Sequence, residues 1–134
     1  MKFFNFLISL ILMLVSSAGL AQTTLAAGQQ KIQHVVIVWL KQHGDSELQQ
    51  QYIAASKPFA ALPGVLSYTV GTPASIKRER PNPSLDESYD LAISSSFENQ
   101  QAYQEFLKNP EYIRVAMEVL RPLVDRYRVY DFVE

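Results

Sequence analysis

The chain has 134 residues, with 12 basic and 13 acidic side chains, a formal net charge of −1 and 48% hydrophobic residues. Because the charges balance and no basic stripe alternates with aromatic residues, the composition argues against a nucleic-acid-binding surface. The sequence contains no cysteine, which excludes disulfide bonds, thiolate chemistry and most structural zinc sites.

Residues 1–21 have the pattern of a secretory signal peptide. Lys2 supplies a positive charge, residues 3–15 form an apolar run, and small residues precede a cleavage site at Ala21. The alternative is an uncleaved membrane anchor, but the run is shorter than the roughly 20 residues that a spanning helix needs. We therefore expect cleavage after Ala21, a periplasmic or secreted protein without a membrane segment, and a flexible leader over residues 22–30.

Residues 31–134 are predicted to form one domain that begins with a strand and a helix. Residues 32–41 are rich in β-branched side chains and predict a strand, and alternation makes both of its faces apolar. Asp45 or Ser46 is expected to cap the following helix, because Ser46 begins a capping-box pattern. Pro58 limits the regular part of this helix to roughly three turns.

Two further strands are predicted on either side of a long irregular segment. Residues 65–70 follow a Pro-Gly turn and form the second strand. Residues 89–97 form the third strand, with large side chains on one face and smaller ones on the other. Residues 72–88 between them hold three prolines and alternating charges, and such long loops in compact domains are usually functional or mobile.

The last part of the chain is predicted to contain an interrupted helix and a fourth strand. Ser96 is expected to cap a helix in which Tyr103 and Leu107 form an apolar pair. Asn109 then caps a new helix whose first residue is a proline. The apolar stripe of this new helix consists of Ile113, Met117, Leu120 and Val124. Residues 127–133 are predicted to form the last strand.

The predicted order of strand–helix–strand–strand–helix–strand indicates an α+β, ferredoxin-like fold, with an antiparallel four-stranded sheet and helices on one face. The other face stays open, although the strand at residues 32–41 is apolar on both sides. Monomers rarely expose a patch of that size. At about 25 cal/mol per Å², covering even a few hundred Å² contributes several kcal/mol. We therefore expect the same face of a second copy to cover it, in a two-fold homodimer.

Four segments in chain order carry a family resemblance. They are HVVIVWLK, LPGVLSYTVGTPAS, SYDLAISSSFENQQAYQEFLKNPEY and VYDFVE, which together span residues 32–133. In order and spacing they resemble the stress-responsive A/B barrel (Dabb) family. The resemblance implies that two four-stranded sheets pair into a dimeric α/β barrel. The segment RERPNPSLDESYD is similar to the long loop of the family's exported bacterial branch.

The resemblance alone assigns no activity, because most members of the family have no assigned activity. One plant member is a polyketide cyclase with a Tyr-x-x-His-Pro-x-His pattern at the helix break. In the matching segment FLKNPEY, Phe106 stands at the Tyr position, Asn109 at the first His and Tyr112 at the second. Because phenylalanine has no proton to give, this departure argues against the cyclase mechanism at that geometry.

Six side chains are candidates for a site in a cavity between the sheet and the helices. His34, a histidine common in the family's first strand, is the candidate acid or base, and Tyr112 is a candidate phenol. Alternatively, His34 ties its strand to a neighbouring loop, and Tyr112 packs its ring against the sheet. The candidate ligand contacts are Trp39, Tyr89, Phe106 and Asn109. The first two of these are alternatively aromatic residues of the core or of the dimer interface.

Other polar residues are expected to be structural or solvated. His43 adjoins a turn glycine and is expected to be solvated. Asp90 and Asp131 lie in predicted strands, and because buried acids need partners, we expect ion pairs with arginines. The candidate arginines are Arg78, Arg80 and Arg114. We recognise no metal-ligand set and no phosphate loop or cofactor motif, so neither a metal nor a cofactor is expected.

Three functions remain open at this point. The first is a dimer that binds a small apolar ligand without catalysis. The second is a cofactor-free lyase, cyclase or monooxygenase-type enzyme that uses His34 as an acid or base. The third is a structural or stress-related dimer without a ligand. A fully packed interior would exclude the first two, whereas a pocket lined by both His34 and Tyr112 would favour the second.

Overall fold

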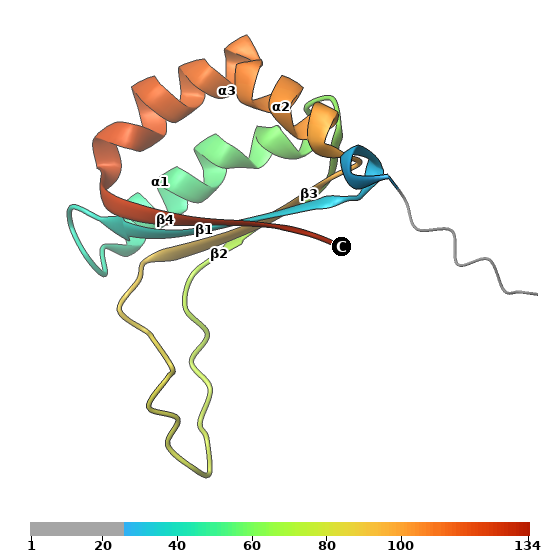
Figure 1. Cartoon of the computed structure of the whole chain (residues 1–134). Coiled ribbons are helices and arrows are strands. Elements are labelled where there is room, and N and C mark those ends of the chain that lie inside the picture. Colours follow the sequence, from blue (N-terminus) through green and yellow to red (C-terminus); the bar gives the residue numbers. More distant parts are fainter. Residues whose placement is uncertain (1–25) are drawn as a thin grey trace, which may run out of the picture.

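The computed structural model describes residues 26–134, so the predicted signal peptide and its cleavage site lie outside the described residues. One antiparallel sheet and a layer of helices form the domain (Figure 1). The strands are β1 Ile32–Leu40, β2 Val65–Gly71, β3 Leu91–Phe97 and β4 Val124–Val133. The helices are α1 Ser46–Ser56, α2 Gln100–Lys108 and α3 Pro110–Arg114. Shorter helical turns are η1 Ala27–Gln29, η2 Lys57–Ala61, η3 Val115–Leu120 and η4 Arg121–Leu123.

The sheet has the strand order β2-β3-β1-β4, with every neighbouring pair antiparallel. All three α-helices cover the same face of the sheet, and the opposite face has no helix on it (Figure 1). This is the predicted ferredoxin-like α+β fold, which the structure confirms. Because β1 lies between β3 and β4, every second side chain of β1 lies near the middle of the helix-covered face.

Short-range hydrogen bonds explain where the helices begin. Asp45, rather than Ser46, caps α1, because its carboxylate accepts from the backbone N–H groups of residues 47 and 48. Asn99 caps α2, so the prediction of Ser96 was wrong; Ser96 instead lies within β3. Asn109 caps α3, as predicted, and accepts from the N–H groups of residues 111 and 112.

Three boundaries differ from the sequence prediction. The strand β3 begins at Leu91, two residues later than predicted; the side chain of Asp90, just before it, accepts from the backbone N–H groups of Leu40 and Gly44, and the backbone N–H of Asp90 donates to the carbonyl of Val38. The strand β4 begins at Val124, three residues earlier than predicted, where it pairs with Leu40. The expected leader includes a 3-10 turn at residues 27–29 that lies beside α2 (Figure 1).

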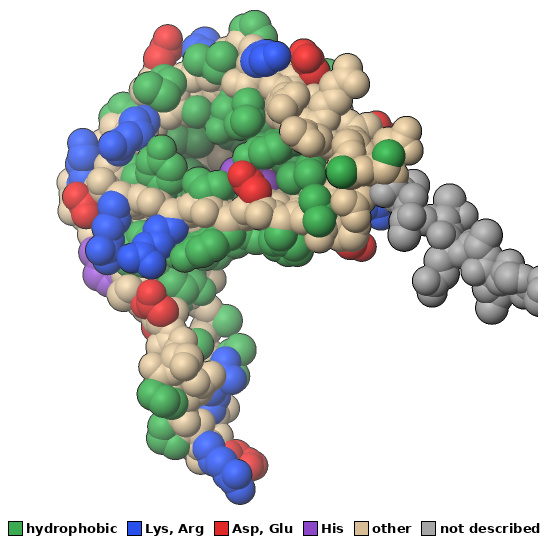
Figure 2. Space-filling model, viewed as in Figure 1, with side chains coloured by type: hydrophobic (Ala, Val, Ile, Leu, Met, Phe, Trp, Pro, Cys, Tyr) green, Lys and Arg blue, Asp and Glu red, His purple; other side chains and the backbone are tan. Residues whose placement is uncertain are grey.

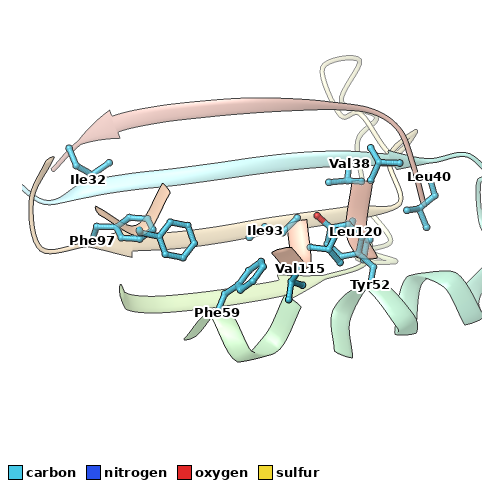
Figure 3. Close-up of a cluster of buried hydrophobic side chains, with 12 residues drawn as sticks. Ile32, Val38, Leu40, Tyr52, Phe59, Ile93, Phe97, Val115 and Leu120 are labelled. Atoms are coloured by element: carbon cyan, nitrogen blue, oxygen red, sulfur yellow. The ribbon is translucent and has the colours of Figure 1, made fainter. Parts of the chain in front are cut away.

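The core fills the space between the helices and the sheet. It includes Phe97, Leu91 and Val38 from the sheet, with Phe59 and Leu120 from the helical layer (Figure 3). Ring centroids of neighbouring aromatic residues are 4.4 to 6.4 Å apart. Such spacing adds attraction beyond the burial of apolar area.

A glycine sets the approach of α2 to the start of β2. Gly64 has a φ angle of 82°, which favours glycine. A Cβ atom placed on it would lie 2.9 Å from the Cβ atom of Ala102 in α2. No other residue type fits this contact without moving the helix.

The helix-free face of the sheet, which we call the open face, is apolar over most of its centre. It carries Val35 and Ile37 from β1, opposite Tyr130 and Arg128 of β4. The strand β3 contributes only alanine and serine side chains to this face. Tyr130 and Phe132 are exposed. Among the described residues nothing covers this part of the sheet.

Candidate functional site

A cavity of about 300 Å³ opens between the sheet and the helical layer. Figure 2 shows it as a hollow surrounded by hydrophobic side chains, with a histidine inside. Its floor comes from β1, β2, β3 and β4, and its roof from the helices and their connecting turns. The interior of the domain is therefore not fully packed. The volume is at the lower end of the range for small-molecule sites in proteins, about 300–1,000 Å³.

One polar row crosses the floor of the cavity. The strand register places Tyr68 opposite Ser95, Ser95 opposite His34, and His34 opposite Asp131. Since side chains alternate along a strand, all four residues point toward the helices. Two residues further along the strands, the equivalent row consists of Val70, Ile93, Val36 and Val129. The floor therefore has one polar end and an apolar remainder.

Asp131 fixes the orientation of His34. The Nδ1 atom of His34 lies 2.6 Å from the Oδ1 atom of Asp131. Because a carboxylate only accepts hydrogen bonds, we assign the hydrogen to Nδ1, which leaves Nε2 as the proton acceptor of the neutral ring. Among residues 26–134, Nε2 has no hydrogen-bond partner, and it is not sealed from solvent. His34 thus presents an unpaired ring nitrogen beside the cavity.

Tyr103 of α2 completes a three-residue cluster. Its hydroxyl oxygen lies 2.9 Å from the Nδ1 atom of His34 and 3.2 Å from the Oδ2 atom of Asp131. Because Nδ1 carries a hydrogen, the phenol donates to the carboxylate. Burial, reinforced by the negative charge of Asp131, raises the pKa of Tyr103 above its usual range. The phenol therefore stays protonated near neutral pH.

Three further tyrosines surround the cavity, namely Tyr52 from α1, Tyr68 from β2 and Tyr112 from α3. Burial raises the pKa of each of them, and that of Tyr68 reaches about 12. In the described part of the chain, no buried side-chain oxygen lacks a hydrogen-bond partner. Since no side chain pairs with the Tyr52 hydroxyl, that group must reach the cavity. The walls therefore offer protonated phenols to a ligand that carries an acceptor.

The structure brings together only some of the candidates from the sequence. His34, Tyr112 and Phe106 all line the cavity. The ring of Tyr112 also packs against that of Phe106 in α2, with their centroids 4.4 Å apart. The prediction for Asn109 needs correction, because its side chain caps α3 and does not line the cavity.

The predicted ligand contacts Trp39 and Tyr89 also lie outside the cavity. The side chain of Trp39 points to the open face, since the parity of β1 is opposite to that of His34. There the guanidinium of Arg126 lies 4.4 Å from the ring centroid, and the indole N–H donates to Ser88. Tyr89 lies at the base of the long loop, just before β3. Because Trp39 and His34 lie on opposite faces of β1, only His34 faces the cavity.

Asp131 and Tyr103 are the functional residues that sequence reasoning missed. The helical spacing predicts that Tyr103 is half of an apolar pair, and the need of a buried acid for a partner predicts that Asp131 pairs with an arginine. The arginine pairing was wrong, because Asp131 pairs with His34 and Asp90 with His43. Arg114 instead binds Glu111, one turn away in α3. The available signal was the strand register, since pairing of the first strand of the chain, β1, with the last, β4, places Asp131 directly opposite His34.

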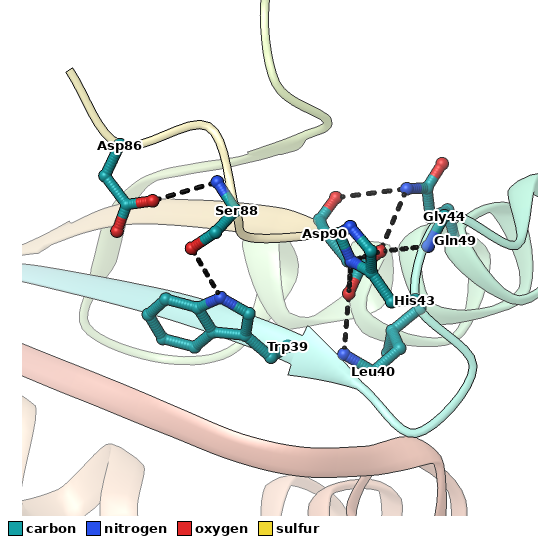
Figure 4. A network of polar contacts seen from close by, with 8 residues as sticks. All are labelled: Trp39, Leu40, His43, Gly44, Gln49, Asp86, Ser88 and Asp90. Atoms are coloured by element: carbon teal, nitrogen blue, oxygen red, sulfur yellow. Dashed lines mark hydrogen bonds and ion pairs between the residues drawn. The ribbon is translucent and has the colours of Figure 1, made fainter.

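A second histidine–aspartate pair has a structural role. The buried carboxylate of Asp90 accepts from the N–H groups of Leu40 and Gly44 and pairs with Nδ1 of His43 (Figure 4). These groups belong to the end of β1 and the turn that leads into α1. His43 is therefore exposed but paired, which corrects the expectation that it is simply solvated. Although burial opposes ionisation, hydrogen bonds from Gly44, Leu40 and His43 hold the pKa of Asp90 below its usual value.

Residues 26–134 contain no cluster of three or more side chains suited to a metal ion. Within the same residues no helix has the length and apolar character needed to cross a membrane.

An antiparallel four-stranded sheet with all helices on one face, and a small apolar cavity between the two layers, define a ferredoxin-like α+β protein. The chain belongs to the stress responsive A/B barrel domain family, Dabb, whose family model matches residues 32–134. The match covers every strand of the sheet and confirms the family predicted from the sequence. No curated protein sequence matches the chain.

Solved structures of low sequence identity share the fold. A Dabb family protein from Mesorhizobium loti is 23% identical, with a TM-score of 0.63, and the match covers 79% of this chain and 98% of that one. A dimeric ferredoxin-like protein of unknown function from Thermobifida fusca is 17% identical, with a TM-score of 0.62 and coverages of 83% and 97%. A hydroxynitrile lyase from Passiflora edulis is 16% identical, with a TM-score of 0.63 and coverages of 79% and 94%.

Proposed function

We propose that this protein binds a small, largely apolar molecule that carries one polar group in the cavity between its sheet and its helices. The observation that supports this most is the division of the cavity floor. His34, Asp131 and Tyr103 cluster at one end, and valine and isoleucine side chains form the rest. Ligand sites generally combine an apolar lining with a few well-placed polar groups.

The dimensions admit a molecule of one or two rings, since an apolar cavity of about 150 Å³ already holds a single ring. At about 3.3 Å per residue, the floor from His34 to Val38 is roughly 13 Å long. The polar group of the ligand would accept from a phenol or donate to Nε2 of His34. The apolar body would lie over Val36 and Ile93, beneath Phe106.

The test is a thermal-shift and calorimetric screen of one-ring aromatic molecules with and without a carbonyl or hydroxyl group. The wild-type protein is compared with His34→Ala and with His43→Ala, a matched control in which the lost histidine also pairs with an aspartate but lies outside the cavity. We expect a carbonyl- or hydroxyl-bearing compound to bind, and His34→Ala to weaken its binding at least tenfold, about 1.4 kcal/mol. Equal losses in the two variants, or no binding at all, would contradict the proposal.

A second candidate function is acid–base catalysis of lyase type, which the His34–Asp131 pair favours. A carboxylate that holds one ring nitrogen of a histidine leaves the other nitrogen oriented to take a proton. In the cleavage of a hydroxynitrile, His34 would remove the hydroxyl proton while the carbon–carbon bond to the nitrile breaks. The carbonyl product forms, and the protonated imidazole returns the proton to cyanide. Such a cycle needs no cofactor.

The fold shared with the Passiflora edulis hydroxynitrile lyase suggests a direct assay. Cyanide release from the hydroxynitrile of an aromatic aldehyde is measured for the wild-type protein, His34→Ala and His43→Ala. Release that is faster than the uncatalysed rate and is lost only in His34→Ala would support catalysis. Binding of the aldehyde without cyanide release would be consistent with the proposed ligand-binding function and would contradict the lyase function.

We infer that two copies pair through their open faces. The exposed Tyr130 and Phe132 and the small side chains of β3 support this, because they allow another sheet to approach closely. Relatives of the same fold from Thermobifida fusca and Bacteroides fragilis are described as dimeric. Light scattering should give twice the chain mass at micromolar concentration, whereas a stable monomer would contradict the inference.

We further propose that the chain is exported, as the pattern of its first 21 residues indicates. Expression in a Gram-negative host with N-terminal sequencing is expected to yield a protein that begins at Gln22. A product that retains Met1 and the apolar run in the membrane fraction would support the anchor instead.

A further inference from the structure

A long arm extends from the sheet on the side of its open face. Residues 72–90 join β2 to β3 without regular secondary structure and project away from the helices (Figure 1). Nearly all of this segment is exposed, including the apolar side chains of Ile76 and Leu85, at 59% and 41%. We call this segment the arm. Any molecule that covers the open face therefore lies next to it.

The base of the arm is fixed to the domain. The buried Asp90 holds one end, and Ser88 accepts from the indole of Trp39 (Figure 4). The carboxylate of Asp86 accepts from Ser88, and this bond, helped by the charges of Arg126 and Arg128, lowers the pKa of Asp86. The arm thus leaves the sheet in a defined direction.

The base of the arm lies beside the basic part of the open face. Arg126 and Arg128 are the basic residues that β4 contributes to this face, the guanidinium of Arg126 lies 4.4 Å from the ring centroid of Trp39, and Trp39 donates to Ser88 of the arm. A two-fold pair of identical copies that meets through the open faces therefore brings the base of each arm next to the other copy.

The length of the arm exceeds what packing of two sheets requires. Each half of the arm, outward from the sheet and back, has about nine residues and spans up to about 30 Å when extended. Packed sheets, in contrast, lie about 10 Å apart. An arm of this length passes the partner's sheet. Between the two halves of the arm lies a hollow of about 170 Å³, lined by apolar residues that include Ile76, Leu85 and Tyr89 and by the charged Arg78, Asp86 and Glu87.

We propose that the arm clasps a second copy of this chain, with Ile76 and Leu85 buried against the partner. The proposal rests on the inferred dimer and adds a second contact beyond the open faces. Among the described residues, it assigns a role to the long segment that the cavity and the fold leave without a function.

The first test measures the dimer dissociation constant of the purified chain by analytical ultracentrifugation. The variant carries Ile76→Ser together with Leu85→Ser, and the matched control is Ile113→Ser. Ile113 is an equally apolar side chain, 44% exposed, on α3 in the helical layer, away from the open face. We expect the dimer dissociation constant of the arm variant to be at least tenfold higher than that of the wild type, and that of the control to be unchanged.

The outcomes separate the arm from the dimer itself. A wild-type dimer with an unchanged dissociation constant in the arm variant would overturn the arm proposal and leave the open-face dimer standing. A wild-type chain that stays monomeric would overturn both.

A cross-linking experiment reads the contact directly. Because the chain has no cysteine, Ile76→Cys introduces a single thiol that carries a photoreactive label. Isotopically labelled and unlabelled copies are mixed, irradiated and analysed by mass spectrometry. We expect cross-links between labelled and unlabelled peptides, whereas cross-links confined to one copy would overturn the proposal.

Discussion

The two histidine–aspartate pairs of this domain distribute burial in opposite ways. In the pair beside the cavity, the histidine side chain is 12% exposed and the aspartate 45%. In the pair at the β1–α1 turn, the histidine is 64% exposed and the aspartate 0%. Both pairs form through Nδ1. The distances are 2.6 Å beside the cavity and 3.1 Å at the turn, and the exchange of burial between histidine and aspartate distinguishes the roles of the two pairs.

The difference in burial indicates which residue of each pair makes the important contacts and which residue supports it. Asp90 is the centre of its pair, because it binds two backbone N–H groups that have no other partner, and His43 is an accessory. His34 is the centre of the other pair, because Asp131 and Tyr103 orient its ring and leave Nε2 free. The first arrangement stabilises a turn, and the second leaves Nε2 of His34 unpaired beside the cavity, where we propose that a ligand binds.

The largest expected effect is on stability. Asp90→Ala leaves the N–H group of the buried Leu40 without its carboxylate partner, at a cost of about 1–3 kcal/mol, and also removes the charge-assisted bonds to Gly44 and His43. We expect the free energy of unfolding to fall by about 3 kcal/mol or more in urea denaturation. Asp131→Ala, at an exposed carboxylate, is the matched control and should cost less than about 1 kcal/mol. Equal losses would show that the two pairs do not differ in this way.

A second expectation concerns the pH dependence of stability. The pKa of Asp90 is lower in the folded state than its ordinary value. The ionised carboxylate therefore stabilises the fold above the ordinary value of about 3.9. This contribution is lost as the pH falls through that value toward the folded-state pKa. Unfolding curves between pH 6 and about 3 should show a smaller loss of stability for Asp90→Asn than for the wild type. Parallel curves for the two proteins would assign acid unfolding to other carboxylates.

The smallest expected effect is on ligand affinity and comes from Tyr103→Phe. This change removes a hydroxyl that acts on the ligand through Asp131 and His34, so we expect affinity for the best aromatic compound to fall about threefold, roughly 0.7 kcal/mol. Tyr130→Phe removes a hydroxyl from the open face and should have no effect in the same calorimetric measurement. A loss of tenfold or more for Tyr103→Phe would indicate direct contact between this phenol and the ligand.

The fold could be predicted from the sequence because local signals repeat over whole elements. Alternation in residues 32–41 gave both the strand and the facing of its side chains, and Asn109 with its following proline gave the helix break. Single polar groups were less predictable. Asn99 and Ser96 are both residue types that cap helices, so the local pattern did not select the cap that the structure uses, and no local pattern marks the late start of β3 at Leu91.

The candidate site was only half predictable, for a different reason. His34 and Asp131 are 97 positions apart in the chain, and they meet because β1 and β4 pair in one register. A shift of one residue would turn Asp131 to the open face. Tyr103 has helical spacing suited to packing, and its hydroxyl finds a partner only once α2 has docked. Trp39 failed as a candidate on the same grounds, since its parity directs it to the other face.

The contact of Gly64 with Ala102 has a consequence for this cluster. Ala102 directly precedes Tyr103, so the residue that meets the glycine is the neighbour of the one that meets His34 and Asp131. Any side chain at position 64 would displace α2 and carry the phenol with it. The distance between the His34 ring and the Tyr103 hydroxyl thus depends on position 64, although Gly64 contacts neither group. Variation at that position in other members of the fold would retune the chemistry of the cavity without altering its lining.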